Sequence, residues 1–577
     1  MTRKARTLLA LTAAAAAALA LPTVAWAHAV LVRTVPEASV VVNRPPPVVL
    51  VTYTESVEPR FAAISVTSAA GESQAVGSPR RSAADPKTLV VPLRRVAQGW
   101  YLVYWRVISA DGHPVRGAFT FAVGPNPGPA PQFVVPSISE TAATPRLIAA
   151  RSVVFVALMA AIGLFILRIA VARPVVRLVP ETHLRAVSVA FFAASAVALV
   201  AIPIYVALST ADFALRSVFD LGDVVPLMRG SAFGRGFLDL ELVLGLFVVA
   251  ATVALWVDRP ERGQRSVAEI LAFTGALAAA AACLLIPGLA GHAAQTSPRG
   301  AMLLFDWLHL AAGSLWVGGL IGLLVLWRSL PVARRVAGLV VSVPRFSNTA
   351  FVSVLFLIGS GVGASLVHLP TLATLWDTSY GQALLVKIGL LCVALLLGAV
   401  NLLRTRPRLL AHRARPELGP GAAALLRRLV AGETLLVVTA VAAAAVLSSL
   451  PPPAKALARV GGASARVGPG RVVEVVKKNG YRIDVRVAPN RAAVPNTFSL
   501  RITRRGLAVR GAEVVAGFTM LDMEMGSQSY ALPETAPGVY TRSAPALVMV
   551  GHWGLSYDIT PPGKAPFSVL IVDKATG

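Results

Sequence analysis

Eight long apolar segments are the feature that most restricts how this chain can fold. A helix needs about 20 mostly apolar residues to cross the hydrocarbon core of a bilayer, and each segment meets that length. The composition agrees, since 55% of the residues are hydrophobic, 14% are charged and the mean hydropathy is +0.68. We therefore predict an eight-helix membrane domain over residues 148–450, with the lipid bilayer as a partner. The segments cover approximately residues 148–170, 186–208, 236–257, 267–289, 302–327, 348–369, 383–403 and 426–450.

The positive charges lie mainly between these segments, and their distribution predicts the topology. The formal net charge is +26, but the basic residues do not cluster on a soluble face, so nucleic acid is not a predicted partner. Loops one, three, five and seven are rich in arginine, whereas the fourth has Arg299 alone and the sixth has none. The positive-inside rule places the arginine-rich loops in the cytoplasm and both chain ends outside, for a multi-pass protein of the cytoplasmic membrane.

The N-terminus has the layout of a secretory signal, which we assign to residues 1–27. Basic residues precede an apolar run over 8–21, and Ala25-Trp26-Ala27 provides small residues at the −3 and −1 positions. Cleavage there would leave His28 first in the mature chain, with a free α-amino group beside its imidazole. These two nitrogens form a chelate suited to Cu(II), which favours tetragonal nitrogen and oxygen ligands. The alternative is a chain start without a metal role.

Strand-like patterns predict a soluble β domain at each end of the membrane region, over residues 28–125 and 471–577. Alternating apolar residues with turn signals at short intervals indicate a β-sandwich for the first domain. Stretches rich in Pro, Gly and Ala at 126–147 and 451–470 are the predicted linkers. The strands expected in the first domain cover residues 48–53, 63–67, 88–91, 101–107 and 118–123.

The turn before the last of these strands carries a second candidate ligand group, Asp111-Gly112-His113-Pro114. Asp111 and His113 flank a glycine, so both side chains can point at one ion. With His28 they would supply two imidazoles, an amine and a carboxylate for Cu(II). The first domain contains no Met or Cys, so it offers no soft ligand for Cu(I). A plain hairpin turn is the alternative.

The first domain resembles the copper-resistance family CopC. The resemblance rests on His28-Ala29, Pro36, Tyr53-Thr54-Glu55 and the segment Gly99–Gly117, which includes the Asp-Gly-His-Pro motif. It implies a cupredoxin-like β-sandwich that binds one Cu(II) through His28, Asp111 and His113. The Met-rich loop of some members is absent from this sequence.

The membrane region resembles CopD, a partner that is often fused to CopC. The resemblance rests on Trp307–Leu320, on Tyr380–Lys387, on Asn401, and on Arg428 and Glu433. Fused chains of this kind resemble the YcnJ-type copper transport proteins, which implies copper handling by the whole chain.

Ionisable residues within the membrane segments are costly and usually functional, so they mark a candidate entry site for metal. His309 lies about 10 Å into the fifth segment, at 1.5 Å per residue, and Asp306 is one turn earlier on the same face. With His292 and His368 they form the predicted outer cluster; the alternative is helix packing and contact with interfacial water. Lys387 and Glu433 are expected to snorkel or to form structural pairs. Ser314, Gly318 and Gly322 repeat every four residues, which predicts close helix packing.

The last domain concentrates thioethers near one histidine, which suggests a Cu(I) site because soft sulfur ligands select that ion. The alternative is a Met-lined core. Residues 518–573 resemble the YtkA-like β-sandwich domain. The candidate ligands are Met520, Met523, Met525, Met549 and His552.

These features predict a copper-binding membrane protein rather than an enzyme. No phosphate loop, Asp-Lys-Thr-Gly or Cys-Pro-Cys motif is present, so ATP-driven pumping is not expected. Three functions remain open: import of captured copper, extracytoplasmic sequestration, and a haem-binding oxidoreductase, which ranks last. The predicted cofactor is copper, as Cu(II) in the first domain and Cu(I) in the membrane and last domain. Extracytoplasmic copper chaperones are the expected protein partners.

Overall fold

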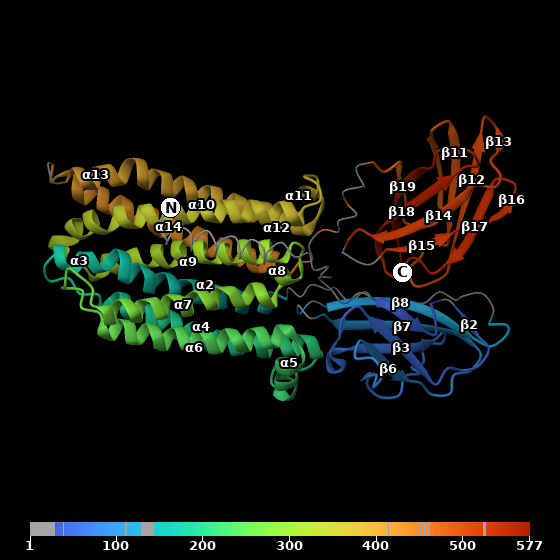
Figure 1. Ribbon diagram of the computed structural model, residues 1–577, viewed down its shortest axis with the longest axis horizontal. Helices are drawn as coiled ribbons and strands as arrows, with labels where there is room; N and C mark the ends of the chain where they lie inside the picture. The colour runs from blue at the N-terminus through green and yellow to red at the C-terminus, as the bar shows by residue number, and fades with distance from the viewer. Residues whose placement is uncertain are drawn as a thin grey trace, which may run out of the picture. The chain divides into compact units, whose positions relative to one another are not determined.

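The computed structural model describes three parts of the chain. They are residues 29–127 except 30, 39, 110, 111 and 113; residues 144–450 except 413 and 414; and residues 453, 457 and 462–576 except 523–526. For His292, Gln295 and Asp377 the backbone alone is described. A β domain, a helical membrane domain and a second β domain follow one another along the chain, as predicted (Figure 1).

The first β domain is a sandwich of two four-stranded sheets, with strand orders β1-β3-β6-β5 and β2-β8-β7-β4. All five expected strands are confirmed. Residues of β3 alternate between buried and partly exposed, which is the pattern of a strand with one face on the core. The strands are β1 (Leu31–Val35), β2 (Val41–Val42), β3 (Val48–Tyr53), β4 (Ala63–Ser68), β5 (Arg80–Arg81), β6 (Thr88–Pro92), β7 (Gly99–Ile108) and β8 (Pro114–Val123), with the short 3-10 helix η1 (Pro59–Phe61).

The membrane domain contains, among the residues described, eight helices long and apolar enough to cross a bilayer (Figure 1). Each predicted segment corresponds to one of them, although most helices extend several residues beyond the apolar core. The elements are α2 (Pro145–Leu167), η2 (Arg168–Ala172), α3 (Arg173–Leu178), α4 (Arg185–Ala214), η3 (Leu221–Asp223), α5 (Val224–Gly230), α6 (Ala232–Val257), α7 (Val267–Ala290), α8 (His292–Gln295), α9 (Arg299–Ser329), η4 (Val332–Arg334), α10 (Arg335–His368), α11 (Thr374–Asp377), α12 (Ser379–Val400), η5 (Asn401–Thr405), α13 (Arg406–Ala411) and α14 (Leu418–Leu447).

Helices α2 and α9 approach each other at glycines, which confirms the packing role predicted for the small residues of α9. A Cβ on Gly318 would meet the backbone of Gly163, and it would lie 2.7 Å from the Leu164 nitrogen. A Cβ on Gly322 would lie 2.8 Å from the Leu167 side chain. In lipid, such close backbone contact supplies the van der Waals attraction that holds helices together.

A buried ion network ties the ends of α2, α6 and α7 together. Asp258 accepts from Arg168 at 2.6 Å and from Arg173 at 3.1 Å, and Arg173 also contacts Glu269 at 3.3 Å. Glu269 in turn caps the start of α7 together with Ser266. Buried charges are tolerated when they are paired in this way.

The last β domain is a second two-sheet structure with its own core. One sheet has the order β10-β11-β12-β17-β16, and the other has the order β15-β14-β18-β19-β9. Strand β9 lies within the stretch predicted as a linker and pairs with β19 in parallel, so the domain begins earlier than expected. Its strands are β9 (Ala465–Arg466), β10 (Val472–Lys478), β11 (Tyr481–Ala488), β12 (Asn496–Arg504), β13 (Leu507–Ala508), β14 (Glu513–Met520), β15 (Gln528–Ala531), β16 (Glu534–Ala536), β17 (Val539–Ala544), β18 (Gly551–Thr560) and β19 (Phe567–Ala575).

Replacing Gly318 with Leu should separate α2 from α9 and lower the free energy of unfolding by about 1–3 kcal/mol, the usual range for overpacking. Gly275→Leu on α7 is the matched control, because a Cβ there meets nothing within 4 Å. Thermal unfolding of both variants in detergent measures the difference. Equal midpoints for the two would contradict a packing role for Gly318.

Candidate functional site

His309 lies between three membrane helices and uses both ring nitrogens. Its Nδ1 is 3.1 Å from the Ser360 hydroxyl on α10, and its Nε2 is 3.2 Å from the Lys387 ammonium on α12. The Ser360 hydroxyl donates to the Phe356 carbonyl oxygen at 2.6 Å, so it can accept from His309 Nδ1–H. This network assigns the proton to Nδ1 and leaves the Nε2 lone pair facing Lys387.

Asp306 lies one turn before His309 and close to the backbone of α7. A Cβ on Gly288 would lie 2.7 Å from Asp306 Oδ2, so the glycine makes room for the carboxylate. A Cβ on Gly361 would lie 3.4 Å from His309 Cε1, so α10 also packs against the imidazole. Asp306 also interacts electrostatically with Lys387. Helices α7, α9, α10 and α12 thus enclose one imidazole, one carboxylate and one ammonium.

The predicted entry site of His292, Asp306, His309 and His368 stays a prediction. His292 begins α8 and His368 ends α10. Within the described parts of the chain, no three His, Cys, Asp or Glu side chains are grouped as metal ligands. The ionisable group that the described contacts place next to His309 is Lys387.

Lys387 and Glu433 are expected to snorkel or to form structural pairs, and the structure bears out the pairing alternative for both. The Lys387 ammonium contacts His309 inside the bundle. Glu433 is 5% exposed, and its carboxylate accepts from the Trp316 indole N–H at 2.7 Å. Sequence reasoning missed Ser360 and the role of Lys387. Lys387 could have been found, because an ionisable residue within an apolar segment is a signal of function. Ser360 could not, because nothing in the sequence distinguishes it from the other serines.

The predicted Cu(II) ligands His28, Asp111 and His113 lie outside the described residues. The structure does describe Gly112, whose φ of +84° and N–H to Ser109 oxygen bond of 2.9 Å form a tight turn. The turn joins β7 to β8, which pair as far as Ile108 and Pro114. The strand after the turn therefore begins at residue 114 rather than near residue 118, because the hairpin ladder continues up to the turn.

In the last domain, Met520 and Met549 are 1% and 6% exposed and belong to the hydrophobic core. Their burial favours the core alternative for these two, while Met523 and Met525 lie outside the described residues. His552 is exposed, and its Nδ1 is 2.9 Å from Asp522 Oδ1. Asp522 also accepts from the His552 backbone N–H at 2.8 Å. The carboxylate thus orients the imidazole at the start of β18 and leaves Nε2 available.

A buried carboxylate on the neighbouring strand adds negative charge near His552. Burial raises the pKa of Asp573, while a 2.9 Å hydrogen bond from the Asn490 amide counteracts this shift. Trp553, next to His552, pairs with Asp573 across β18 and β19. Two carboxylates therefore accompany the one histidine at this end of the sheet.

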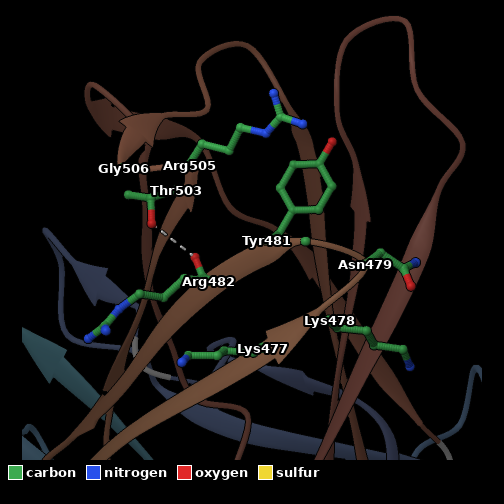
Figure 2. Close-up of a pocket in the computed structure, with 9 residues that line it drawn as sticks. Lys477, Lys478, Asn479, Tyr481, Arg482, Thr503, Arg505 and Gly506 are labelled. Atoms are coloured by element: carbon green, nitrogen blue, oxygen red, sulfur yellow. Dashed lines mark hydrogen bonds between the residues drawn. The ribbon is translucent and has the colours of Figure 1, made fainter.

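An open pocket at the other end of this domain has a different chemistry. Its lining comes from the hairpin turns after β10 and β12, where Thr503 Oγ1 lies 3.5 Å from the Arg482 carbonyl oxygen (Figure 2). The lining side chains are basic, polar and aromatic, without His, Cys or Met, so this pocket does not suit copper. They belong to Lys477, Lys478, Asn479, Gly480, Tyr481, Arg482, Thr503, Arg505 and Gly506.

Three family models match the chain in the order expected: the CopC domain at residues 31–124, Copper resistance protein D at 340–447, and YtkA-like at 476–558. The "Copper transport protein CutJ" of Bacillus subtilis is 27% identical over 391 residues, which cover 67% of this chain and 70% of that protein. "Protein YobA" of Escherichia coli K12 is 35% identical over 99 residues, or 17% of this chain and 80% of that protein. The crystal structure of CopC from Methylosinus trichosporium OB3b has 30% identity, covers 19% of this chain and all (100%) of that chain, and gives a TM-score of 0.16.

Replacing both Met523 and Met525 with Leu should remove Cu(I) binding from the last domain, because Leu has a similar volume but no thioether. The matched control replaces Met520 and Met549, whose burial in the core predicts unchanged binding. A competition titration of the full chain with a Cu(I) chelator gives the number of ions bound by each variant. If the first pair of substitutions leaves that number unchanged, the Cu(I) site is elsewhere.

Proposed function

We propose that this chain, which belongs to the CopC–CopD family of copper-resistance membrane proteins, captures copper outside the cytoplasmic membrane and passes it inward. Copper is the cargo in this proposal. The observation that carries it is the His309 cluster, in which an imidazole nitrogen and a carboxylate lie among four membrane helices. Buried ionisable groups of this kind mark ion pathways in membrane proteins.

The arginine-rich loops support the proposed orientation. They follow the first, third, fifth and seventh membrane helices, so the positive-inside rule puts both β domains on the outer side. The first domain would then take up Cu(II) through His28, Asp111 and His113. The last domain would bind Cu(I) if its exposed His552 is joined by thioethers.

The Lys387 ammonium would compete with the metal for the Nε2 lone pair of His309. Copper would take the Nε2 lone pair of His309, which now accepts from the Lys387 ammonium at 3.2 Å. The ammonium would have to leave, and Asp306 is the anionic group nearby that interacts with it. Ser360 would meanwhile hold the ring through Nδ1, as partners of metal-bound imidazoles commonly do.

His309→Ala should abolish copper entry into proteoliposomes that contain the full chain and an internal copper probe. Ser360→Ala should lower entry about 10- to 100-fold, the usual effect of losing a partner of a ligating histidine. His183→Ala is the control, because His183 is exposed in a loop. Copper held outside by the wild-type protein, with none inside, would instead support sequestration.

Capture by the first domain should require the processed N-terminus. The full chain that begins at His28 should bind Cu(II) tightly, whereas one extra residue in front removes the free amine beside the imidazole and should weaken binding. Isothermal titration with a competing Cu(II) chelator compares the two forms. Equal affinities would remove the His28 amine from the site.

A further inference from the structure

Glu433 lies near the centre of a membrane helix and takes no part in the proposed copper site. It is fifteen residues after Leu418 and fourteen before Leu447, the two ends of α14, and it is 5% exposed. Such a carboxylate is costly in hydrocarbon unless something compensates its charge. The groups in contact with the Glu433 carboxylate therefore indicate which cation can neutralise it.

Two neutral donors hold the Glu433 carboxylate. The Trp316 indole N–H on α9 donates to Oε1 at 2.7 Å, and the Asn401 side chain also forms a hydrogen bond with the group. Asn401 begins the π-helical turn η5, and π turns inside helices are frequent at functional sites. A Cβ on Gly398, one turn earlier, would lie 3.5 Å from Oε1, so the glycine admits the carboxylate against α12.

No cationic side chain in the described part of the chain compensates this carboxylate. It forms no ion pair there, in contrast with Asp258, which is also 5% exposed and pairs with two arginines, and with Glu269, which pairs with one. The elements in contact with α14 carry ionisable groups, but none of them pairs with Glu433. These groups include Arg151 on α2, His309 on α9, Lys387 on α12, Arg404 on η5 and Arg428 on α14 itself.

A metal ion does not fit this environment. Indole and amide N–H groups cannot ligate a cation, and Cu(I) selects thioether, thiolate or imidazole ligands. Hard cations such as Ca²⁺ take about six or more oxygen ligands, whereas the described contacts of this carboxylate are with N–H donors. A proton needs a single oxygen and removes the charge completely.

We propose that Glu433 is a proton-binding site inside the membrane domain, loaded and emptied during transport. Trp316 lies seven residues after His309 on α9, about 10 Å along the helix and on nearly the same face. One rigid helix thus joins the proposed copper site to the proton site. The coupling to copper rests on the proposed function, whereas proton binding by Glu433 does not.

Infrared spectroscopy of the copper-free full chain in lipid tests the site directly. The carbonyl band of a protonated carboxylic acid should be present and be lost in Glu433→Gln. In Trp316→Phe the band should shift, because its oxygen loses the indole donor. Glu241→Gln on α6 is the control, since it changes another membrane carboxylate and should leave the Trp316-sensitive band in place. Absence of a Glu433-dependent band across roughly pH 5 to 9 would overturn the proposal.

Copper entry into proteoliposomes under an imposed pH gradient tests the coupling. Entry through the wild-type chain should change with the gradient, and Glu433→Gln should lose that dependence while copper still binds. A dependence that survives in Glu433→Gln, or one on a sodium gradient instead, would overturn the coupling. If the wild-type chain moves no copper but keeps the Glu433 band, the proposed function fails and the proton site stands.

Discussion

The close contact of α2 and α9 decides where the functional groups of the membrane domain lie. Gly318 is nine residues after His309, and at about 100° per residue it falls on the opposite side of the helix. Trp316, seven residues after His309, falls on nearly the same side as the imidazole. Because Gly163 and Gly318 hold one face of α9 against α2, the other face must present Asp306, His309 and Trp316 to α7, α10, α12 and α14.

The polar groups on this face form two clusters with different electrostatics. Around His309, an ammonium and a carboxylate partly balance each other, so a positive charge already occupies the position that a metal ion would take. Around Glu433, two neutral donors surround a carboxylate that has no cationic partner among the residues described. A membrane interior of low dielectric makes both arrangements sensitive to the arrival of one charge. The proposed entry of a copper ion at His309, or of a proton at Glu433, would therefore change the charge balance of its cluster.

Much of the fold could be predicted because it follows from local patterns. The eight helices follow from apolar length, and strands such as β3 follow from alternation with turn residues between them. The two residues of β9 could not be predicted, since they pair in parallel with β19, about a hundred residues away. The candidate site likewise has a part that the sequence predicts and a part that it does not. His309 and Asp306 stand out as ionisable residues on one helical face, whereas the Lys387 and Ser360 contacts depend on how three helices pack.

The methionines of the last domain show why a ligand type alone does not define a site. Met520 and Met549 have the chemistry that Cu(I) prefers, yet both are packed among apolar side chains. His552 has the opposite situation, since it is exposed and oriented by Asp522. A metal site needs ligands that converge with their lone pairs available. A thioether packed into the core does not meet this need, although its sulfur is a soft ligand. His309 meets part of this criterion, because Ser360 orients its ring, whereas its Nε2 faces the Lys387 ammonium.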